Sequence, residues 1–247
     1  MKLKVQLISD KGLVRNHNED EALVCGYFYR DESFSGEFDT AVYSRFTAIV
    51  ADGMGGTAGG EFASDLSLVS FDDFIRDLPD ELSPVDVRER VEQWVESFQK
   101  EIIAKGIELP QFRDMGTTFV GMFCYEDHLY SINVGDSRLY RWREGKLMPF
   151  SIDHSMRNLK NDDSIPANLM YNCFGGGGGD AFADLADIST EWEVGDVWII
   201  CSDGLSDLVD DAKIESLVPL RSATSLVDAA KEAGGRDNIT VVLIEII

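Results

Sequence analysis

The stretch Val50-Ala-Asp-Gly-Met-Gly-Gly-Thr-Ala-Gly-Gly60 joins a buried apolar segment to an amphipathic one. The apolar run 46–51 predicts a strand that ends at Asp52, and the helical spacing of apolar residues from Phe62 onwards predicts a helix over 61–78. Glycine lets another group approach the backbone closely. A carboxylate beside exposed carbonyls suits Mg²⁺ or Mn²⁺, which take oxygen ligands. An ordinary strand–turn–helix with a capping Asp fits this stretch equally well.

Composition indicates a globular protein with a substantial core. The chain has 247 residues, of which 44% are hydrophobic and 10% aromatic, and we expect one domain over residues 1–247. No apolar run approaches the ~20 residues that span a bilayer. The first residues alternate like a strand and do not have the form of a signal peptide.

The cysteines indicate a cellular compartment, and the net charge argues against some classes of binding partner. Cys25, Cys124, Cys173 and Cys201 are scattered without a C-x-x-C pair, so we expect reduced thiols and a cytoplasmic location. The formal net charge of −23 argues against nucleic acid as a partner, because phosphate backbones need a basic surface. It argues equally against an anionic membrane surface.

The order of the predicted elements indicates an α+β fold. A first helix over 61–78 is followed by a second from Pro84, capped by Ser83. Further helices are expected over 210–218 and 223–233. Residues 31–40 read as a polar loop, and 151–180 as an irregular segment ending in the run Gly175–Gly179. The predicted strands are 2–9, 22–29, 46–51, 117–125, 128–134, 138–142, 146–149, 196–202 and 239–246. Strands separated from helices in this order predict antiparallel sheets with helix pairs outside.

Carboxylates recur at the edges of the predicted strands, often beside glycine. They are Asp52, Asp203, Asp136, Asp237 and the pair Glu19-Asp20. If neighbouring strands bring these ends together, the cluster cannot stay ionised without cations. The expected solution is a centre of two Mg²⁺ or Mn²⁺ ions. Only His17 lies near a carboxylate at ligand-like spacing, so a zinc site is not expected. Taken singly, each Asp-Gly fits a plain turn.

Several short motifs, in this order, resemble those of one family. The matching segments are Arg15-Asn-His-Asn-Glu-Asp20, Val50-Ala-Asp-Gly-Met-Gly-Gly56, Gly116-Thr-Thr118, Val134-Gly-Asp-Ser-Arg-Leu-Tyr140, Asp153-His-Ser155, Cys201-Ser-Asp-Gly-Leu205 and Gly235-Arg-Asp-Asn-Ile-Thr-Val-Val242. Together they cover residues 5–245 and resemble a bacterial-type metal-dependent protein serine/threonine phosphatase of the type-2C (PPM) family. The resemblance implies a four-layer α-β-β-α sandwich, with two antiparallel sheets flanked by antiparallel helix pairs.

The resemblance also implies metal ligands. Asp52 is expected to bridge two Mn²⁺ or Mg²⁺ ions, and Gly53 to offer its carbonyl to the first. Asp203 and Asp237 are expected to hold the second ion, and Asp136 to join Asp203 at a weaker third.

Two further roles follow from the same resemblance. Glu19 and Asp20 are expected at or just behind the metals, partly through water. Because adjacent strand residues point to opposite faces, both reach the centre only if the backbone is irregular or one of them acts indirectly. Arg15 is expected to bind the substrate phosphate, since a guanidinium presents a planar fork to phosphate oxygens.

These roles imply hydrolysis of phosphoserine and phosphothreonine monoesters in proteins, reversing the action of a bacterial serine/threonine kinase. A metal-bridging water or hydroxide attacks phosphorus in line, without a covalent phospho-enzyme. Arg15 and the metals neutralise charge on the transferring oxygens. Ser202 precedes Asp203 in the way that a nucleophile precedes its partner, but a small residue in a packed strand explains it better.

The chain departs from the family pattern at three places. Met54 stands where eukaryotic members carry a histidine thought to act as a general acid, so the leaving group must take its proton from water or from His17. An exposed loop histidine is the alternative reading of His17, and His154 reads as structural. Residues 156–180 form a shortened flap, which leaves the site more open, and the run Gly175–Gly179 suggests a mobile loop.

Two other functions remain open from the residues alone. One is a non-catalytic binding module that keeps the fold and has lost the chemistry. The other is a phosphatase for small phosphorylated metabolites, since no substrate-reading segment is recognisable. We expect a monomer that prefers phosphorylated sites flanked by basic residues, because the acidic surface repels acidic phosphoproteins.

Overall fold

The computed structural model describes residues 1–55, 59–166, 168–176 and 179–247, whose strands form two sheets. The six-stranded sheet contains, in spatial order, β10 (Lys146–Pro149), β9 (Arg138–Arg143), β13 (Val197–Cys201), β14 (Ile239–Ile246), β1 (Lys2–Asp10) and β4 (Ser33–Asp39). The eight-stranded sheet contains β11 (Phe174–Gly175), β6 (Gly116–Thr117), β5 (Thr47–Met54), β7 (Phe119–Tyr125), β8 (His128–Val134) and β12 (Asp184–Asp187), with β2 (Asp20–Val24) beside β5 and β3 (Tyr27–Tyr29) beside β2.

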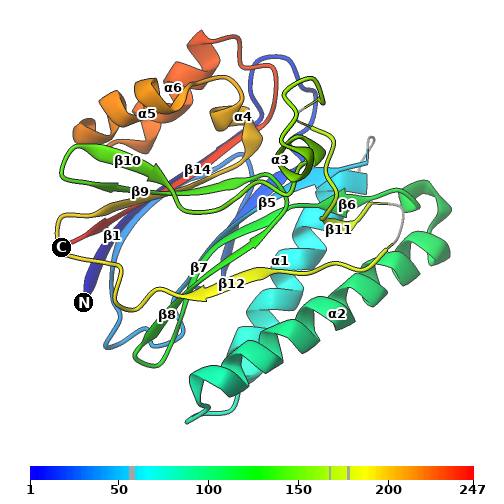
Figure 1. Ribbon diagram of the computed structural model, residues 1–247, viewed down its shortest axis with the longest axis horizontal. Coiled ribbons are helices and arrows are strands. Elements are labelled where there is room, and N and C mark those ends of the chain that lie inside the picture. The colour runs from blue at the N-terminus through cyan, green and yellow to red at the C-terminus, as the bar shows by residue number, and fades with distance from the viewer. Residues whose placement is uncertain (56–58, 167, 177–178) are drawn as a thin grey trace.

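Helices cover the outer faces of both sheets. The helices of the described residues are α1 (Gly59–Asp77), α2 (Pro84–Glu108), α3 (Met156–Lys160), α4 (Asp203–Ser206), α5 (Asp211–Leu217) and α6 (Ala223–Glu232), with the 3₁₀ turns η1 (Pro110–Phe112) and η2 (Val218–Leu220). Of these, α3 has no buried residue and does not cover a sheet. Figure 1 shows α5 and α6 outside the six-stranded sheet, and α1 and α2 on the opposite side of the molecule. The expected four-layer α-β-β-α sandwich is confirmed.

Three clusters of buried side chains lie between the layers. One fills the space between the two sheets, with Val50 of β5 facing Ile200 and Val242 of the other sheet. A second joins α1 and α2 to the eight-stranded sheet, and a third joins α4, α5 and α6 to the six-stranded sheet. Because β5 is buried on both faces, its sequence is a continuous apolar run and does not alternate.

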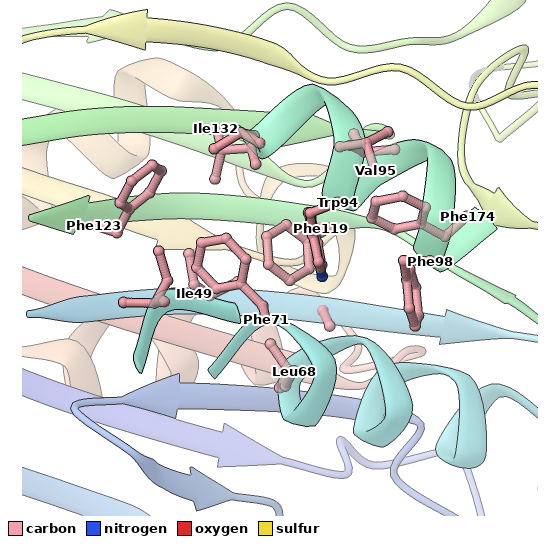
Figure 2. Close-up of a cluster of buried hydrophobic side chains, with 14 of the residues drawn as sticks. Ile49, Leu68, Phe71, Trp94, Val95, Phe98, Phe119, Phe123, Ile132 and Phe174 are labelled. Atoms are coloured by element: carbon pink, nitrogen blue, oxygen red, sulfur yellow. The ribbon is translucent and has the colours of Figure 1, made fainter. Parts of the chain in front are cut away.

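The cluster under α1 and α2 is rich in aromatic rings (Figure 2). Phe71 of α1 lies at its centre, with ring centroids 5.0 Å from Trp94, 5.0 Å from Phe119 and 5.5 Å from Phe123. Edge-to-face contacts of this kind add to the free energy gained from burial. They fix both helices against β7.

The second helix begins as its sequence predicts. Ser83 accepts a hydrogen bond from the backbone N–H of Asp86, and the Asp86 carboxylate accepts one from the backbone N–H of Ser83. This capping box satisfies two backbone donors that the helix leaves free. Pro84 occupies the first turn, where its missing N–H costs nothing.

Three regions differ from the expected elements. The predicted strand 22–29 breaks at Cys25 and Gly26, whose φ angles of 48° and 81° make a two-residue hairpin turn between β2 and β3. Residues 31–40 are not a loop, because β4 pairs with β1 there and turns Phe34 and Phe38 towards the inter-sheet core. The sequence did not predict this strand because Phe34 and Phe38 lie among polar residues on an edge strand.

The remaining differences lie at element ends and in the segment 151–187. β5 continues to Met54 because Gly53 and Met54 pair with β6. The region expected to be irregular contains α3 and β11, and β12 follows it without having been predicted. Residues 56–58 of the opening stretch and 177–178 of the glycine run lie outside the described residues, so the expected mobile loop is not described. Within the described part, no helix combines the length and apolar character needed to cross a bilayer.

We predict that Phe71→Ala lowers the free energy of unfolding by about 3–5 kcal/mol, because it leaves a cavity among rings that cannot all move inward. Urea unfolding of the folded protein measures the change. Val69→Ala on the same helix is the matched control, since Val69 is 38% exposed and its truncation is expected to cost less than about 1 kcal/mol. Equal losses for the two variants would contradict the packing described.

Candidate functional site

Aspartates from distant segments meet at one end of the sandwich. Asp52 of β5 lies opposite Asp20 of β2 in the antiparallel pair. Asp203 opens α4 directly after β13, and Asp136 lies in the turn after β8. Asp237 lies two residues before the start of β14. The predicted convergence of strand-edge carboxylates is therefore present in the structure.

A polar cavity of about 280 Å³ collects these groups. Its lining includes Arg15, Glu19, Asp52, Gly53, Met54, Asp136, Asp203 and Asp237. A larger cavity of about 390 Å³ lies elsewhere, near β8 and β12. Among its described lining residues, Arg88 and Asp184 are the charged ones, whereas the smaller cavity collects the carboxylate cluster.

Four carboxylates of the cluster, those of Asp20, Asp52, Asp136 and Asp203, resist ionisation. Burial, followed by the charges of neighbouring aspartates, raises the pKa of Asp136 to about 7 and that of Asp203 to about 6. Burial and the same kind of repulsion raise the pKa of Asp52 well above its usual value. Burial raises the pKa of Asp20 to about 7, against hydrogen bonds from Ser202 and Thr240 that lower it. Bound cations would remove this cost.

Glu19 and Asp20 point in different directions, as expected for neighbours near a strand. Glu19 lines the cavity, whereas Asp20 is 1% exposed and is not among the lining residues of the described cavity. The Ser202 hydroxyl donates to Asp20 Oδ2 at 2.7 Å and accepts the backbone N–H of Thr240 at 3.0 Å. Asp20 thus lies behind the cavity, and Ser202 is a buried linker rather than an exposed nucleophile.

Arg15 lies at the rim of the cavity. Its Nη2 donates to Asp237 Oδ2 at 2.8 Å, and this hydrogen bond raises the pKa of Arg15. The guanidinium is half exposed. The structure thus pairs the predicted phosphate-binding cation with one of the predicted metal ligands.

Two glycines allow the backbone segments of the site to touch. A Cβ at Gly53 would lie 2.1 Å from the carbonyl oxygen of Gly60, and a Cβ at Gly204 would lie 1.8 Å from that of Asn238. Real Cβ atoms do not come so close, so these positions require glycine because of contact and not because of an unusual φ. The glycines that follow Asp52 and Asp203 are therefore a packing requirement of the site.

Asn238 has a role that the sequence did not reveal. Its Oδ1 accepts the backbone N–H of Glu19, and its Nδ2 donates to the carbonyl oxygens of Lys11 and His17. The side chain is 4% exposed. It holds both ends of the loop that carries Arg15 against β14. The sequence signal that could have revealed this role was the position of Asn238 next to Asp237 in one of the matching motifs.

The motif Gly116-Thr-Thr118 holds the backbone of Asp52. Thr118 Oγ1 accepts the Asp52 N–H at 3.0 Å, and the Asp52 carbonyl accepts the Thr118 N–H at 2.9 Å. Thr117 Oγ1 donates to the same carbonyl at 3.1 Å. These bonds explain why a polar pair interrupts an otherwise apolar region.

The donor set suits a hard divalent cation, because the lining residues of the described cavity offer carboxylate oxygens and include neither cysteine nor histidine. The side chains are not gathered into a finished cage, however. Among the described residues, no group of three or more His, Cys, Asp or Glu side chains is placed so that it could hold an ion. Asp237 turns to Arg15 instead.

Comparison with a family model decides the relationship. Residues 29–234 match the model described as protein phosphatase 2C. The chain belongs to the protein phosphatase 2C family. A serine/threonine phosphatase, stp, of Listeria innocua is 25% identical over 96% of this chain and 93% of its own length.

Solved structures agree with this membership. The Mycobacterium tuberculosis serine/threonine phosphatase PstP/Ppp superposes with a TM-score of 0.78 and 28% identity, covering 100% of this chain and 99% of its own. The catalytic domain of PstP in complex with two manganese ions gives a TM-score of 0.76 at 27% identity, and both chains are covered completely. The protein phosphatase 2C sandwich thus extends over the whole chain.

We predict that the metal-free protein loses stability as the pH rises from 5 to 8. The folded carboxylates of Asp136 and Asp203 keep their protons up to pH values near 7 and 6, whereas unfolded aspartates release theirs near pH 3.9. The folded state therefore binds more protons between these limits, and this contribution to stability disappears as the pH rises through the folded pKa. Thermal unfolding in chelator measures it.

Two variants and added Mn²⁺ serve as comparisons for this pH profile. Asp136→Asn removes one charge and is expected to flatten the pH profile, while Asp127→Asn in an exposed turn leaves it unchanged. Added Mn²⁺ is expected to raise the melting temperature more at pH 8 than at pH 5. A metal-free profile that rises between pH 5 and 8 would contradict the electrostatics of the cluster.

Proposed function

We propose that this chain is a metal-dependent phosphatase that hydrolyses phosphoserine and phosphothreonine monoesters of proteins. One observation carries the proposal. In a member of the protein phosphatase 2C family, an arginine and aspartates from separate segments line the same cavity. The name of its relatives, serine/threonine phosphatase, supports the substrate class.

We propose that two Mn²⁺ or Mg²⁺ ions bind in this cavity, and the structure of the PstP catalytic domain in complex with two manganese ions supports this number. Asp52 and the carbonyl of Gly53 would hold the first, and Asp52, Asp203 and Asp237 the second. Asp136 would serve a weaker third. The bound ions supply positive charge and an acidified water for in-line attack on phosphorus. No covalent phospho-enzyme is then required.

Arg15 is proposed to change partner during the cycle. Its guanidinium is half exposed and hydrogen-bonded to Asp237. A metal ion that binds the Asp237 carboxylate would therefore release the Arg15 side chain. The freed fork can then accept two phosphate oxygens. Glu19 faces the cavity and is proposed to act through water, and Asp20 to orient the site from behind.

The source of the leaving group's proton is proposed to be water. Met54 lines the cavity and carries no transferable proton. His17 is exposed and is not among the residues that line the described cavity. The contact that holds its loop is made by the backbone carbonyl of His17, which accepts a hydrogen bond from Asn238 Nδ2, and not by the His17 ring.

We propose that residues 1–247 act as one monomeric phosphatase domain in which 156–180 is a shortened flap. Asn168 and Met170 of this segment form one wall of the cavity. A cognate serine/threonine kinase would act as the functional opposite. The free cysteines, two of them buried, support a reducing, cytoplasmic setting.

We predict that the protein releases phosphate from a phosphothreonine peptide with Mn²⁺ and that chelator abolishes the activity. Asp52→Asn is expected to lower kcat/KM by about 10²-fold or more, the effect of removing one preorganised electrostatic group from a transition-state site. Malachite-green detection of phosphate measures both.

Two variants serve as comparisons. Asp127→Asn makes the same chemical change on an exposed turn and is expected to keep full activity. Arg15→Lys keeps the charge but loses the planar fork, and is expected to raise KM. Activity that survives both chelator and Asp52→Asn would disprove metal-dependent hydrolysis. An inactive wild type that still binds Mn²⁺ would favour a binding module.

We predict a preference for phosphopeptides with flanking lysine or arginine. The net charge of −23 attracts basic peptides and repels acidic ones, and salt screens this effect over about 10 Å at 0.1 M. Initial rates on matched basic- and acidic-flanked peptides, at low and at high salt, measure it. Equal rates at low salt would contradict it, and activity confined to small phosphate esters would favour a metabolite phosphatase.

A further inference from the structure

His154 makes a two-point contact with the turn that carries Asp136. Its ring Nδ1 lies 3.1 Å from the backbone nitrogen of Gly135, and its backbone N–H donates to the Gly135 carbonyl at 2.9 Å. Gly135 has a φ of 111°, and a Cβ there would lie 2.7 Å from Thr118. The contact therefore holds a turn whose conformation few other residues can adopt.

The other polar contacts of the ring determine its tautomer. Asn172 Nδ2 lies 2.7 Å from His154 Nδ1 and also donates to the carbonyl of Phe182, whose N–H bonds to Asn172 Oδ1. Among the described residues, Nδ1 thus faces donors from Gly135 and Asn172. It must act as the acceptor, which leaves the proton on Nε2, 3.1 Å from Asp184 Oδ2.

The same residue anchors the segment that forms a cavity wall. The His154 carbonyl accepts the Tyr171 N–H at 2.9 Å, and Ser155 bridges to Met170 as in an antiparallel ladder. Asn168 and Met170 line the cavity of the carboxylate cluster. One buried side chain and its backbone therefore connect the Asp136 turn, the cavity wall and β12.

His154 cannot itself reach the substrate. It is 1% exposed and is not among the residues that line the described cavity, and both ring nitrogens are engaged. The rings of Tyr171 and Phe182 lie against it, with centroids 5.6 Å and 5.0 Å away. Any effect on metals or catalysis must pass through the groups that it holds.

We infer that His154 is a positioning residue that sets Asp136 for the weakest-bound metal ion, through the hydrogen bond between its Nδ1 and the Gly135 N–H. The inference rests on the proposed function. Groups that orient ligands from outside the coordination shell commonly change metal affinity by about 10–100-fold. The Nδ1 contact controls Asp136, while the Nε2 contact with Asp184 controls only β12.

Two amide substitutions separate the two ring contacts. The amide of His154→Asn reaches the position of Nδ1, so its oxygen still accepts from Gly135 but the contact with Asp184 is lost. The longer His154→Gln reaches the position of Nε2 and keeps Asp184 but leaves the Gly135 N–H without its acceptor. The control is His128→Gln, since His128 also bonds to a carboxylate, that of Asp187, but lies on the surface.

The expected result is an asymmetry between the two amides. His154→Gln raises the dissociation constant of the weakest Mn²⁺ ion, measured by calorimetry, about tenfold, and the Mn²⁺ concentration for half-maximal activity rises equally. His154→Asn and His128→Gln stay within about twofold of the wild type. Amide hydrogen exchange at Gly135 speeds up in His154→Gln alone.

Equal effects of the two amides on Mn²⁺ binding would overturn the inference, as would an unchanged Gly135 exchange rate in His154→Gln. ¹⁵N chemical shifts that place the ring proton on Nδ1 would also overturn it. Calorimetry and exchange do not need catalysis, so they test His154 even if the wild type proves inactive. Thermal unfolding in chelator identifies a variant that has lost its fold, and Asn172→Ala then tests the same Nδ1 position from the partner side, with weaker Mn²⁺ binding expected.

Discussion

The mutual repulsion of buried carboxylates is the constraint on which this end of the sandwich depends. Asp52 and Asp20 lie opposite each other across paired strands, and Asp203 adds a further acidic group from the start of α4. Their pKa values are raised because burial and neighbouring charges disfavour ionisation. A fold would not keep such a cluster for stability, since an unpaired buried charge is costly. The arrangement makes sense as a receptor for positive charge.

Hydrogen bonds and a positively charged side chain of the protein offset part of the free-energy cost of these buried carboxylates. Ser202 donates to Asp20, and Arg15 pairs with Asp237. Ser202 is buried, while Arg15 is half exposed at the rim. This difference separates a carboxylate that supports the site from one that remains available to a ligand. This difference supports the proposal that Arg15 acts first as counterion and then as phosphate ligand.

Around the cluster, neutral hydrogen bonds hold backbone segments in place. Thr118 fixes the backbone of Asp52, Asn238 closes the loop that carries Arg15, and His154 holds the turn before Asp136. All are buried, and each bonds to main-chain groups that would otherwise be unsatisfied. Rigid support of this kind is what a preorganised electrostatic site needs. The two sheets alone would not provide it, because the aspartates lie at strand ends and in turns.

The sequence by itself determined the layered α+β architecture, the capped helix α2 and the identity of the clustered aspartates, because periodicity, caps and Asp-Gly pairs are local signals. It did not predict β4 or β12, since edge strands lack a continuous apolar face. Only the tertiary structure decided that Asp20 lies behind the cavity and that Arg15 pairs with Asp237. It also decided that Asn238 and His154 connect distant loops. These facts depend on contacts between residues far apart in the chain, which no local pattern encodes.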